Sequence, residues 1–355
     1  MNEDGHPFIA DKDDTVLVTG ASGFIGARVV DAFLARGFRR LRCFVRPSSD
    51  IARLSRVISI HGAAEAEIVR GNLLSPKDCM RAAERVTVAC HLAAGRGEKS
   101  YPDAFLNSVV TTRNLLDAIV GVGTCRRFVN VSSMSVYSNH GLRRHGTLDE
   151  TCETDPAPEK RHEAYCYAKV KQDELVLEYS QRTKLPVVII RPGVVYGPGN
   201  RGIHGRVGIG TFGLFLFLGG RNELPLSYVD NCADAVALAG LVPGIEGEVF
   251  NVVDDDLPSA REFLRFYKRN SRHFRSLYVP YRAFYLFSYL WERYAAWSAN
   301  QLPPVFNRRA CETFWKGNRY PNTKLKDRLG WQPAVSTREG VMRYAAAEAA
   351  RVGGE

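Results

Sequence analysis

Short apolar runs alternate with longer amphipathic stretches along the first half of the chain. Runs of the kind that form buried strands begin at Thr15 and recur at four later places: Leu41–Val45, Ala66–Val69, Val86–His91 and Arg127–Val131. Parallel strands that helices cover on both faces are largely apolar along their whole length, as these are. Between them, segments such as Pro76–Ala83 and Asp103–Val120 are expected to be helices. The pattern predicts an α/β fold with a parallel sheet.

The first predicted strand leads into three glycines, Gly20, Gly23 and Gly26, and then into an amphipathic helix. Gly20 allows the turn, Gly23 lets backbone N–H groups approach a pyrophosphate, and Gly26 lets the helix pack against the strand. The first turn of such a helix presents free N–H groups to phosphate. The motif therefore predicts a dinucleotide site built from one segment: Gly20, Ser22, Gly23, Phe24, Ile25 and Gly26.

Ligands of a doubly wound sheet bind outside the carboxyl ends of its strands. The second strand ends at Arg46, and residues 46–49 contain no carboxylate that would select the ribose 2′-hydroxyl of NAD. We therefore expect NADP to be favoured over NAD, unless Arg46 is only a solvated surface residue. The ends of the next two strands add further candidates for cofactor contacts: Asn72, Leu73, Leu92, Ala93 and Ala94.

The predicted architecture is a Rossmann-type doubly wound parallel sheet with a smaller, interleaved C-terminal substrate-binding region. Later strands at Leu185–Arg191 and near Val249 would complete the sheet. We expect a flexible tail at 1–13, a dinucleotide-binding domain at 14–192 completed by residues around 226–253, and a substrate-binding region at 193–225 and 254–355. Two helices, Thr323–Leu329 and Arg338–Arg351, are expected to end the chain.

Polar residues with catalytic potential follow the fifth predicted strand. Ser132 and Ser133 leave its carboxyl end directly, and a charged loop then leads to a helix that carries Tyr165 and Lys169. A spacing of four places the last two side chains on one helix face, where the ammonium lowers the pKa of the phenol. We interpret Tyr165 as a general acid/base, with a serine hydroxyl orienting the substrate oxygen. His91 lies in an apolar strand, and we interpret it as a hydrogen-bonded core residue.

Composition bears on the kind of ligand that the protein binds and on its location in the cell. The net charge of +10 suits an anionic ligand, but the basic residues do not cluster as in a nucleic-acid-binding arm. The eight cysteines form no C-x-x-C pair, so we expect no bound metal and a cytoplasmic location. The polar start of the chain is unlike a signal peptide, and no run is long and apolar enough for a membrane span.

Taken together, these motifs resemble those of the extended short-chain dehydrogenases/reductases, a family that includes nucleotide-sugar epimerases and dehydratases, dihydroflavonol reductases and 3β-hydroxysteroid dehydrogenases. Further segments carry the resemblance: Asn107–Leu116, Arg191–Gly199, Tyr228–Ala235, Glu248–Val252 and Leu329–Pro333. The resemblance implies that Ser133 is the catalytic hydroxyl beside Tyr165, and that Lys169 also holds the nicotinamide ribose. It implies a weaker relay or structural role for Asn107, and it adds three cofactor contacts: Pro192, Val194 and Val195.

Two departures from the nucleotide-sugar members bear on the substrate. Val194 stands where those members have an Asn that contacts the sugar diphosphate, and residues 210–219 and 277–291 are strongly apolar and aromatic. We therefore expect hydride transfer between nicotinamide and an apolar secondary alcohol or ketone, steroid-like or flavonoid-like. A nucleotide-sugar epimerase or dehydratase with transient hydride transfer is the alternative, and a non-catalytic dinucleotide sensor is a third.

The expected partners are a small-molecule substrate, no nucleic acid and a second copy of the chain. The resemblance implies a homodimer that pairs two helices per subunit, and the apolar residues that these helices offer include Leu115, Ile119, Val170 and Val176. The aromatic segment 277–291 has four open interpretations: ordinary core, substrate contact, dimer contact or peripheral contact with a membrane surface.

Overall fold

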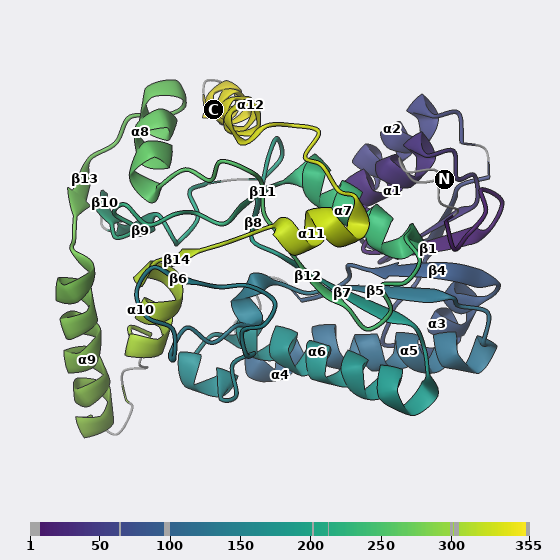
Figure 1. Cartoon of the computed structure of the whole chain (residues 1–355), viewed down its shortest axis with the longest axis horizontal. Coiled ribbons are helices and arrows are strands. Elements are labelled where there is room, and N and C mark those ends of the chain that lie inside the picture. Colours follow the sequence, from purple (N-terminus) through teal and green to yellow (C-terminus); the bar gives the residue numbers. More distant parts are fainter. Residues whose placement is uncertain are drawn as a thin grey trace.

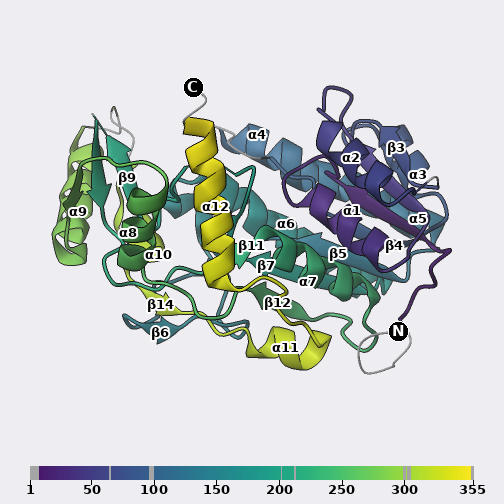
Figure 2. The same cartoon turned by 90° about the horizontal axis from the view of Figure 1, so that it is seen from above.

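The computed structural model describes residues 8–352 except 64, 96–99, 201, 212, 299–300 and 302–304. Three parts of the predicted features lie outside these residues: 1–7 of the tail, Phe212 of the apolar run 210–219, and 353–355. Helices cover both faces of a central sheet, and smaller elements gather at one end of it (Figure 1, Figure 2).

The strands of the central sheet are β1 (Thr15–Thr19), β2 (Leu41–Val45), β3 (Glu67–Arg70), β4 (Val86–His91), β5 (Arg127–Val131), β7 (Val187–Pro192) and β12 (Val249–Val252). Within the described residues, these seven strands run parallel in the order β12-β7-β5-β4-β1-β2-β3. The predicted doubly wound α/β fold is confirmed. The strand order reverses between β1 and β4, which is the place where such sheets bind ligands.

Two groups of helices sandwich the sheet (Figure 1). One face carries α1 (Gly26–Ala35), α2 (Ala52–Ile60), α7 (Val229–Leu241) and α11 (Thr323–Leu329). The other carries α3 (Pro76–Ala83), α4 (Tyr101–Phe105), α5 (Thr111–Val122) and α6 (Ala164–Thr183). Alternate residues of each strand therefore enter different cores: Val16 and Val18 pack with the first group, and Leu17 packs with the second.

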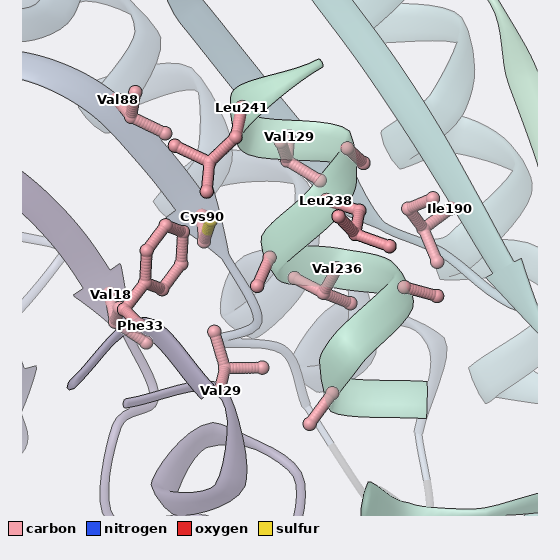
Figure 3. Packing of buried hydrophobic residues seen from close by; sticks show 14 of the residues in the cluster. Val18, Val29, Phe33, Val88, Cys90, Val129, Ile190, Val236, Leu238 and Leu241 are labelled. Atoms are coloured by element: carbon pink, nitrogen blue, oxygen red, sulfur yellow. The ribbon is translucent and has the colours of Figure 1, made fainter. Parts of the chain in front are cut away.

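The core between the sheet, α1 and α7 is shown in Figure 3. Phe33 of α1 points toward Val18 and Cys90 of the sheet, and Val236 of α7 closes the same space. All four side chains have zero exposure to solvent. This packing holds the start of α1 close to the end of β1, which is where the glycine motif lies.

The smaller elements build a separate region beyond β7. A three-stranded sheet consists of β9 (Gly208–Thr211), β10 (Leu214–Phe217) and β13 (Ser276–Tyr278). Two strand pairs join β8 (Val194–Tyr196) to β11 (Leu226–Tyr228), and β6 (Gly146–Thr147) to β14 (Asn318–Arg319). The helices of this region are α8 (Ala260–Asn270), α9 (Tyr281–Trp297), α10 (Arg308–Trp315) and α12 (Thr337–Val352).

Most predicted elements have nearly the expected bounds, but one predicted α-helix is interrupted by a π-helical turn. The helix predicted at Asp103–Val120 is divided into α4, a π-helical turn at Leu106–Val110, and α5. The hydroxyls of Thr111 and Thr112 donate to the carbonyls of Asn107 and Ser108 at this turn. Such side-chain bonds to the backbone compete with the regular helix pattern, and a spacing pattern does not reveal them.

Of the predicted flexible tail at 1–13, the structure describes residues 8–13, and the first of these pack on the fold. The backbone N–H of Ile9 donates to the carbonyl of Leu241 over 2.9 Å, and Ala10 is buried in the core with Phe8 packed against it. Three apolar residues among polar and charged ones gave too weak a signal for this docking. Among the described helices, none is long and apolar enough to span a membrane.

Candidate functional site

The glycine motif forms a tight turn between β1 and α1. Gly20 has φ +68°, and a Cβ placed there would lie 3.1 Å from the backbone nitrogen of Ala93. A Cβ on Gly26 would lie only 2.1 Å from the carbonyl oxygen of Gly20. Neither position admits a side chain, so the first turn of α1 lies close to the sheet. The shape of this cradle suits the pyrophosphate of a dinucleotide, and the binding role of its residues stays a prediction.

A cavity of about 420 Å³ opens at this turn. Its wall combines the glycine motif with the ends of β4 and β5, the start of α6, and the segment after β7. Predicted site residues on the wall are Gly20, Gly23, Phe24, Ile25, Gly26, Leu92, Ala94, Ser133, Tyr165, Lys169, Val194 and Val195. The structure thus brings the predicted cofactor loop and the predicted catalytic residues to one cavity.

Ser133 and Tyr165 are both half-buried on the cavity wall. Ser133 directly precedes a 3₁₀ turn at Met134–Val136, and its Oγ accepts a hydrogen bond from the N–H of Ser135 over 3.1 Å. Tyr165 lies in the first turn of α6. A strand end and a helix start therefore present two hydroxyl groups to the same space.

Lys169 is buried, with 3% of its surface exposed. Its Nζ donates to the carbonyl oxygen of Val131 and to Oε1 of Gln172, each over 2.8 Å. An ammonium has three N–H donors, so these two bonds leave one for the cavity that Lys169 lines. Burial lowers the pKa of Lys169 to about 8, and the neighbouring charge of Asp173 opposes this shift. The side chain is a cation at neutral pH and lies close to its titration range.

A chain of hydrogen bonds connects Lys169 to the cofactor turn. Gln172 Nε2 donates to Thr112 Oγ1 over 2.7 Å, and Thr112 Oγ1 is 2.8 Å from His91 Nε2. On the other side of the ring, Nδ1 is 2.8 Å from Oγ1 of Thr19, the last residue of β1. All the residues between the two ends are buried, so the chain crosses the protein interior from α6 to β1.

The directions of these hydrogen bonds determine which ring nitrogen of His91 carries the proton. The Thr112 hydroxyl donates to the carbonyl of Ser108, so it accepts from His91, which must carry its proton on Nε2. Thr19 Oγ1 accepts from the N–H of Leu92 and donates to Nδ1. Burial lowers the pKa of His91 to about 3, and the ring is therefore neutral. The interpretation of His91 as a hydrogen-bonded core residue is confirmed.

An ion pair anchors α6 to the sheet one turn after Lys169. Asp173 accepts from Arg191 of β7 over 3.1 Å and from Nδ2 of Asn130 of β5 over 3.0 Å. All three residues are buried. The bonds hold α6 against the carboxyl half of the sheet, and they fix the helix that carries Tyr165 and Lys169.

Several predicted site residues lie off the cavity wall. Arg46 and Asn72 are exposed at strand ends, and Asn72 Oδ1 accepts from the N–H of Leu74 over 3.0 Å. Asn107 points along its own turn, where its amide donates to the carbonyl of Asp103. Its neighbour Ser108 faces inward, and its Oγ accepts from the N–H of Gly95. The other residues that are not on the wall are Ser22, Leu73, Ala93 and Pro192.

Sequence reasoning missed several polar or aromatic residues of the wall, and Arg161, His204, Arg206 and Phe314 are among them. The Arg206 guanidinium donates to the carbonyl of Thr313 over 2.8 Å and lies 5.7 Å from the Phe314 ring centre. Burial and, to a lesser extent, the charge of Arg206 lower the pKa of His204 to about 4. No motif marks these residues, because they come from segments far apart in the chain.

A second cavity of about 350 Å³ adjoins the first. The two share Val194, Val195, Asn200 and His204 on their walls. The residues that only the second cavity has are mostly apolar: Tyr196, Gly202, Ile203, Gly205, Val207, Leu224, Leu226, Phe263 and Tyr344. The site therefore extends from the glycine motif into an apolar space of the C-terminal region.

Comparison with known proteins connects this geometry to a family. The model of the NAD dependent epimerase/dehydratase family matches residues 16–252. The 3β-hydroxysteroid-dehydrogenase/decarboxylase isoform 1 of Arabidopsis thaliana is 24% identical over 364 residues, covering 94% of this chain and 80% of that protein. Sterol demethylase protein B of Methylococcus capsulatus is 28% identical over 339 residues, covering 91% and 95%.

Solved structures share the fold. UDP-glucuronic acid 4-epimerase from Bacillus cereus, in complex with NAD, has a TM-score of 0.71 and 20% identity. The alignment covers 96% of this chain and 98% of the epimerase. At this identity the likeness concerns the fold: the central sheet and the smaller C-terminal elements.

Proposed function

The chain belongs to the NAD-dependent epimerase/dehydratase family and is an NAD(P)-dependent enzyme of the extended short-chain type, and from that premise we propose its reaction. The reaction is a net hydride transfer between nicotinamide and a secondary alcohol or ketone of an apolar substrate. The observation that carries the proposal is the buried ammonium of Lys169, held one helical turn from Tyr165 on the wall of the cavity.

In the direction of oxidation, the substrate carbon loses a hydride and its hydroxyl loses a proton. The nicotinamide ring supplies the hydride acceptor or, in reduction, the donor. Tyr165 takes the proton on its phenolate oxygen, and the positive charge of Lys169 favours that phenolate. The Ser133 hydroxyl donates to the substrate oxygen and orients it. In reduction the Tyr165 phenol returns the proton to the forming alkoxide.

A comparison of two tyrosines on α6 tests this role. Tyr165→Phe should bind cofactor nearly as the parent does and turn over about 10²–10⁴-fold more slowly, because only the proton-transfer group is lost. Tyr167→Phe is the matched control, since Tyr167 packs edge-on against Tyr101 at 5.1 Å between ring centres. Turnover near the parental rate in Tyr165→Phe would rule out the assignment.

The apolar substrate is supported by the cavity walls and by the relatives. Val194 offers no polar group to a diphosphate, and the adjoining cavity is lined mostly by aliphatic and aromatic side chains. Relatives along almost the whole chain carry the names of a hydroxysteroid dehydrogenase/decarboxylase and a sterol demethylase protein. A screen of hydroxysteroids, flavanonols and nucleotide sugars for thermal stabilisation in the presence of cofactor would identify the class.

A specific observation favours the alternative, a nucleotide-sugar epimerase or dehydratase. Arg161 and Arg206 both reach the cavity wall, and guanidinium groups suit a diphosphate. Such an enzyme would return the hydride to its product, so the nicotinamide absorbance would show no net change during turnover. A lasting absorbance change with a steroid or flavonoid substrate would exclude it.

We also propose that NADP is preferred over NAD. Arg46 is exposed where β2 ends, and residues 46–49 carry no carboxylate that would repel a 2′-phosphate. A second cation lies near the glycine motif, because the Arg53 guanidinium is 6.0 Å from the centre of the Phe24 ring. Both groups could meet the phosphates of a bound cofactor.

A homodimer through α5 and α6 stays a prediction. Leu115, Ile119, Val170 and Val176 are buried within the subunit's own cores. Of the apolar residues of α6, Leu177 is 37% exposed and available to a partner. Sedimentation of the purified chain at micromolar concentration tests the prediction, and a monomer of 39.6 kDa would reject it.

A further inference from the structure

Helix α9 presents a continuous apolar stripe to solvent. Leu286, Phe287, Leu290, Tyr294 and Trp297 are 57%, 42%, 56%, 47% and 80% exposed. Their spacings of one, three, four and three residues place them along one face of the helix. Single exposed apolar residues are ordinary on a protein surface, but five large ones on one helix face mark an interaction surface.

The opposite face of α9 packs on the protein. Phe284 and Ser288 are buried there, and the Phe284 ring meets Trp315 of α10 edge-on at 5.0 Å between centres. Trp315 in turn contacts the ring of Phe314 at 5.5 Å, and Phe314 lines the main cavity. Two aromatic contacts therefore connect the buried face of α9 to the wall of the main cavity.

The stretch of sequence that contains α8, β13 and α9 holds most of the chain's excess positive charge. Residues 260–298 contain eight Arg and Lys against two Glu, a net +6 of the chain's +10. Arg282 and Arg293 are exposed and lie four residues before Leu286 and Trp297, so they border the stripe. Glu292, the acidic residue of α9, is paired with Arg308.

We propose that the outer face of α9 docks on the surface of an anionic lipid bilayer. The helix would lie in the plane of the interface, with its Leu, Phe and Trp side chains among the acyl chains and its arginines at the lipid head groups. Aromatic side chains with a polar edge favour this boundary. Figures 1 and 2 show α9 at one extreme end of the molecule, where a flat surface can reach it.

Charge argues for lipid rather than for a second copy of the chain. In a two-fold dimer the same patch meets itself, so the exposed Arg282 and Arg293 of one copy would face those of the other. An anionic bilayer neutralises that charge instead, and each arginine near such a surface strengthens binding about fivefold. If the substrate is apolar, which rests on the proposed function, the docked cavity would also lie close to the phase in which that substrate dissolves.

Co-sedimentation of the full chain with vesicles tests the proposal without cofactor or substrate, so its result is independent of turnover. The probes are vesicles of phosphatidylcholine containing phosphatidylglycerol and vesicles of phosphatidylcholine alone. We expect binding to the anionic vesicles, weaker binding to the neutral ones, and weakening by added salt. Absence of binding to the anionic vesicles would overturn the proposal.

A triple variant, Leu286→Ser with Leu290→Ser and Trp297→Ser, should bind the anionic vesicles at least about tenfold more weakly. Its control is Ile60→Ser with Met342→Ser, because these side chains are 75% and 52% exposed on α2 and α12. Equal binding by the triple variant and the parent would overturn the proposal. So would a parental dimer, seen by sedimentation, that the triple variant dissociates, because a second copy would then cover the stripe.

Discussion

The central sheet and helix α9 are both rich in apolar residues, but they place these residues in opposite surroundings. Every residue of β4 and β5 is buried. Of the 17 residues of α9, three are buried: Phe284, Ser288 and Ala295. The sheet has helices of its own chain on both faces, whereas Leu286, Leu290 and Trp297 on the outer face of α9 are each more than half exposed. An apolar surface is expected to be covered, but its sequence does not show whether the cover is the same chain, another chain or a membrane.

The sharpest test of this contrast compares two aromatic truncations. Phe33→Ala should lower the free energy of unfolding by about 3–5 kcal/mol, because its ring is fully buried between α1 and the sheet. Trp297→Ala should change it by less than about 0.5 kcal/mol, because its ring is 80% exposed. Denaturant unfolding measures both. A large loss in Trp297→Ala would show that the α9 stripe is covered within the chain.

The interior beside the central sheet also holds the charge of Lys169, and the effect of burying this charge can be measured from the pH dependence of the free energy of unfolding. The pKa of Lys169 is about 8 in the fold and 10.5 as its ordinary value, so the unfolded chain binds more protons between these pH values. The stability of the parent relative to Lys169→Met should therefore rise from pH 8 to 10.5, by up to about 3 kcal/mol. Below pH 8 the difference should be constant.

Denaturant midpoints of parent and Lys169→Met across this range give the measurement. The variant has no titrating group at the position, so the difference isolates Lys169 from the buried thiols and phenols. A flat difference from pH 7 to 11 would mean that the ammonium is solvated rather than buried.

The chain of hydrogen bonds from Lys169 to Thr19 passes through the side-chain amide of Gln172, so stability should depend on that amide. Gln172→Leu removes an acceptor from Lys169 and a donor from Thr112, so it should cost about 1–3 kcal/mol of stability. It should also shift the pH profile of turnover, because Lys169 loses a bond that orients it. Gln181→Leu, on the exposed side of the same helix, is the control. Identical pH profiles in parent and Gln172→Leu would reduce Gln172 to a packing role.

The smallest effect is expected at the end of β2, where Arg46 is exposed to solvent as the outer side chains of α9 are. Arg46→Ala should weaken NADP binding about tenfold and leave NAD binding unchanged, because only NADP carries the 2′-phosphate. Arg56→Ala, which removes an exposed cation of α2, controls for general loss of charge. Titration of both cofactors measures the preference, and unchanged NADP affinity in Arg46→Ala would show that Arg46 faces solvent in the complex.

Local rules were sufficient for the sheet and for much of the candidate site. Strands, helices and the glycine turn are each specified by a few adjacent residues, and the carboxyl ends of parallel strands meet at one edge. Ser133, Tyr165, Lys169 and the glycine motif could therefore be assigned to one site in advance, and they do line one cavity. The domain bounds and the catalytic roles stay predictions.

Contacts between residues distant in the chain could not be read in the same way. No spacing indicates that His91, Thr112 and Gln172 form one hydrogen-bonded chain, or that Ser108 rather than Asn107 faces inward at a π-helical turn. The same holds for Arg206 on the cavity wall, and for α9, whose sequence is apolar on both faces. Its orientation follows from the fit of Phe284 against Trp315, because burial depends on which surfaces meet in space and not on the apolar character of one segment.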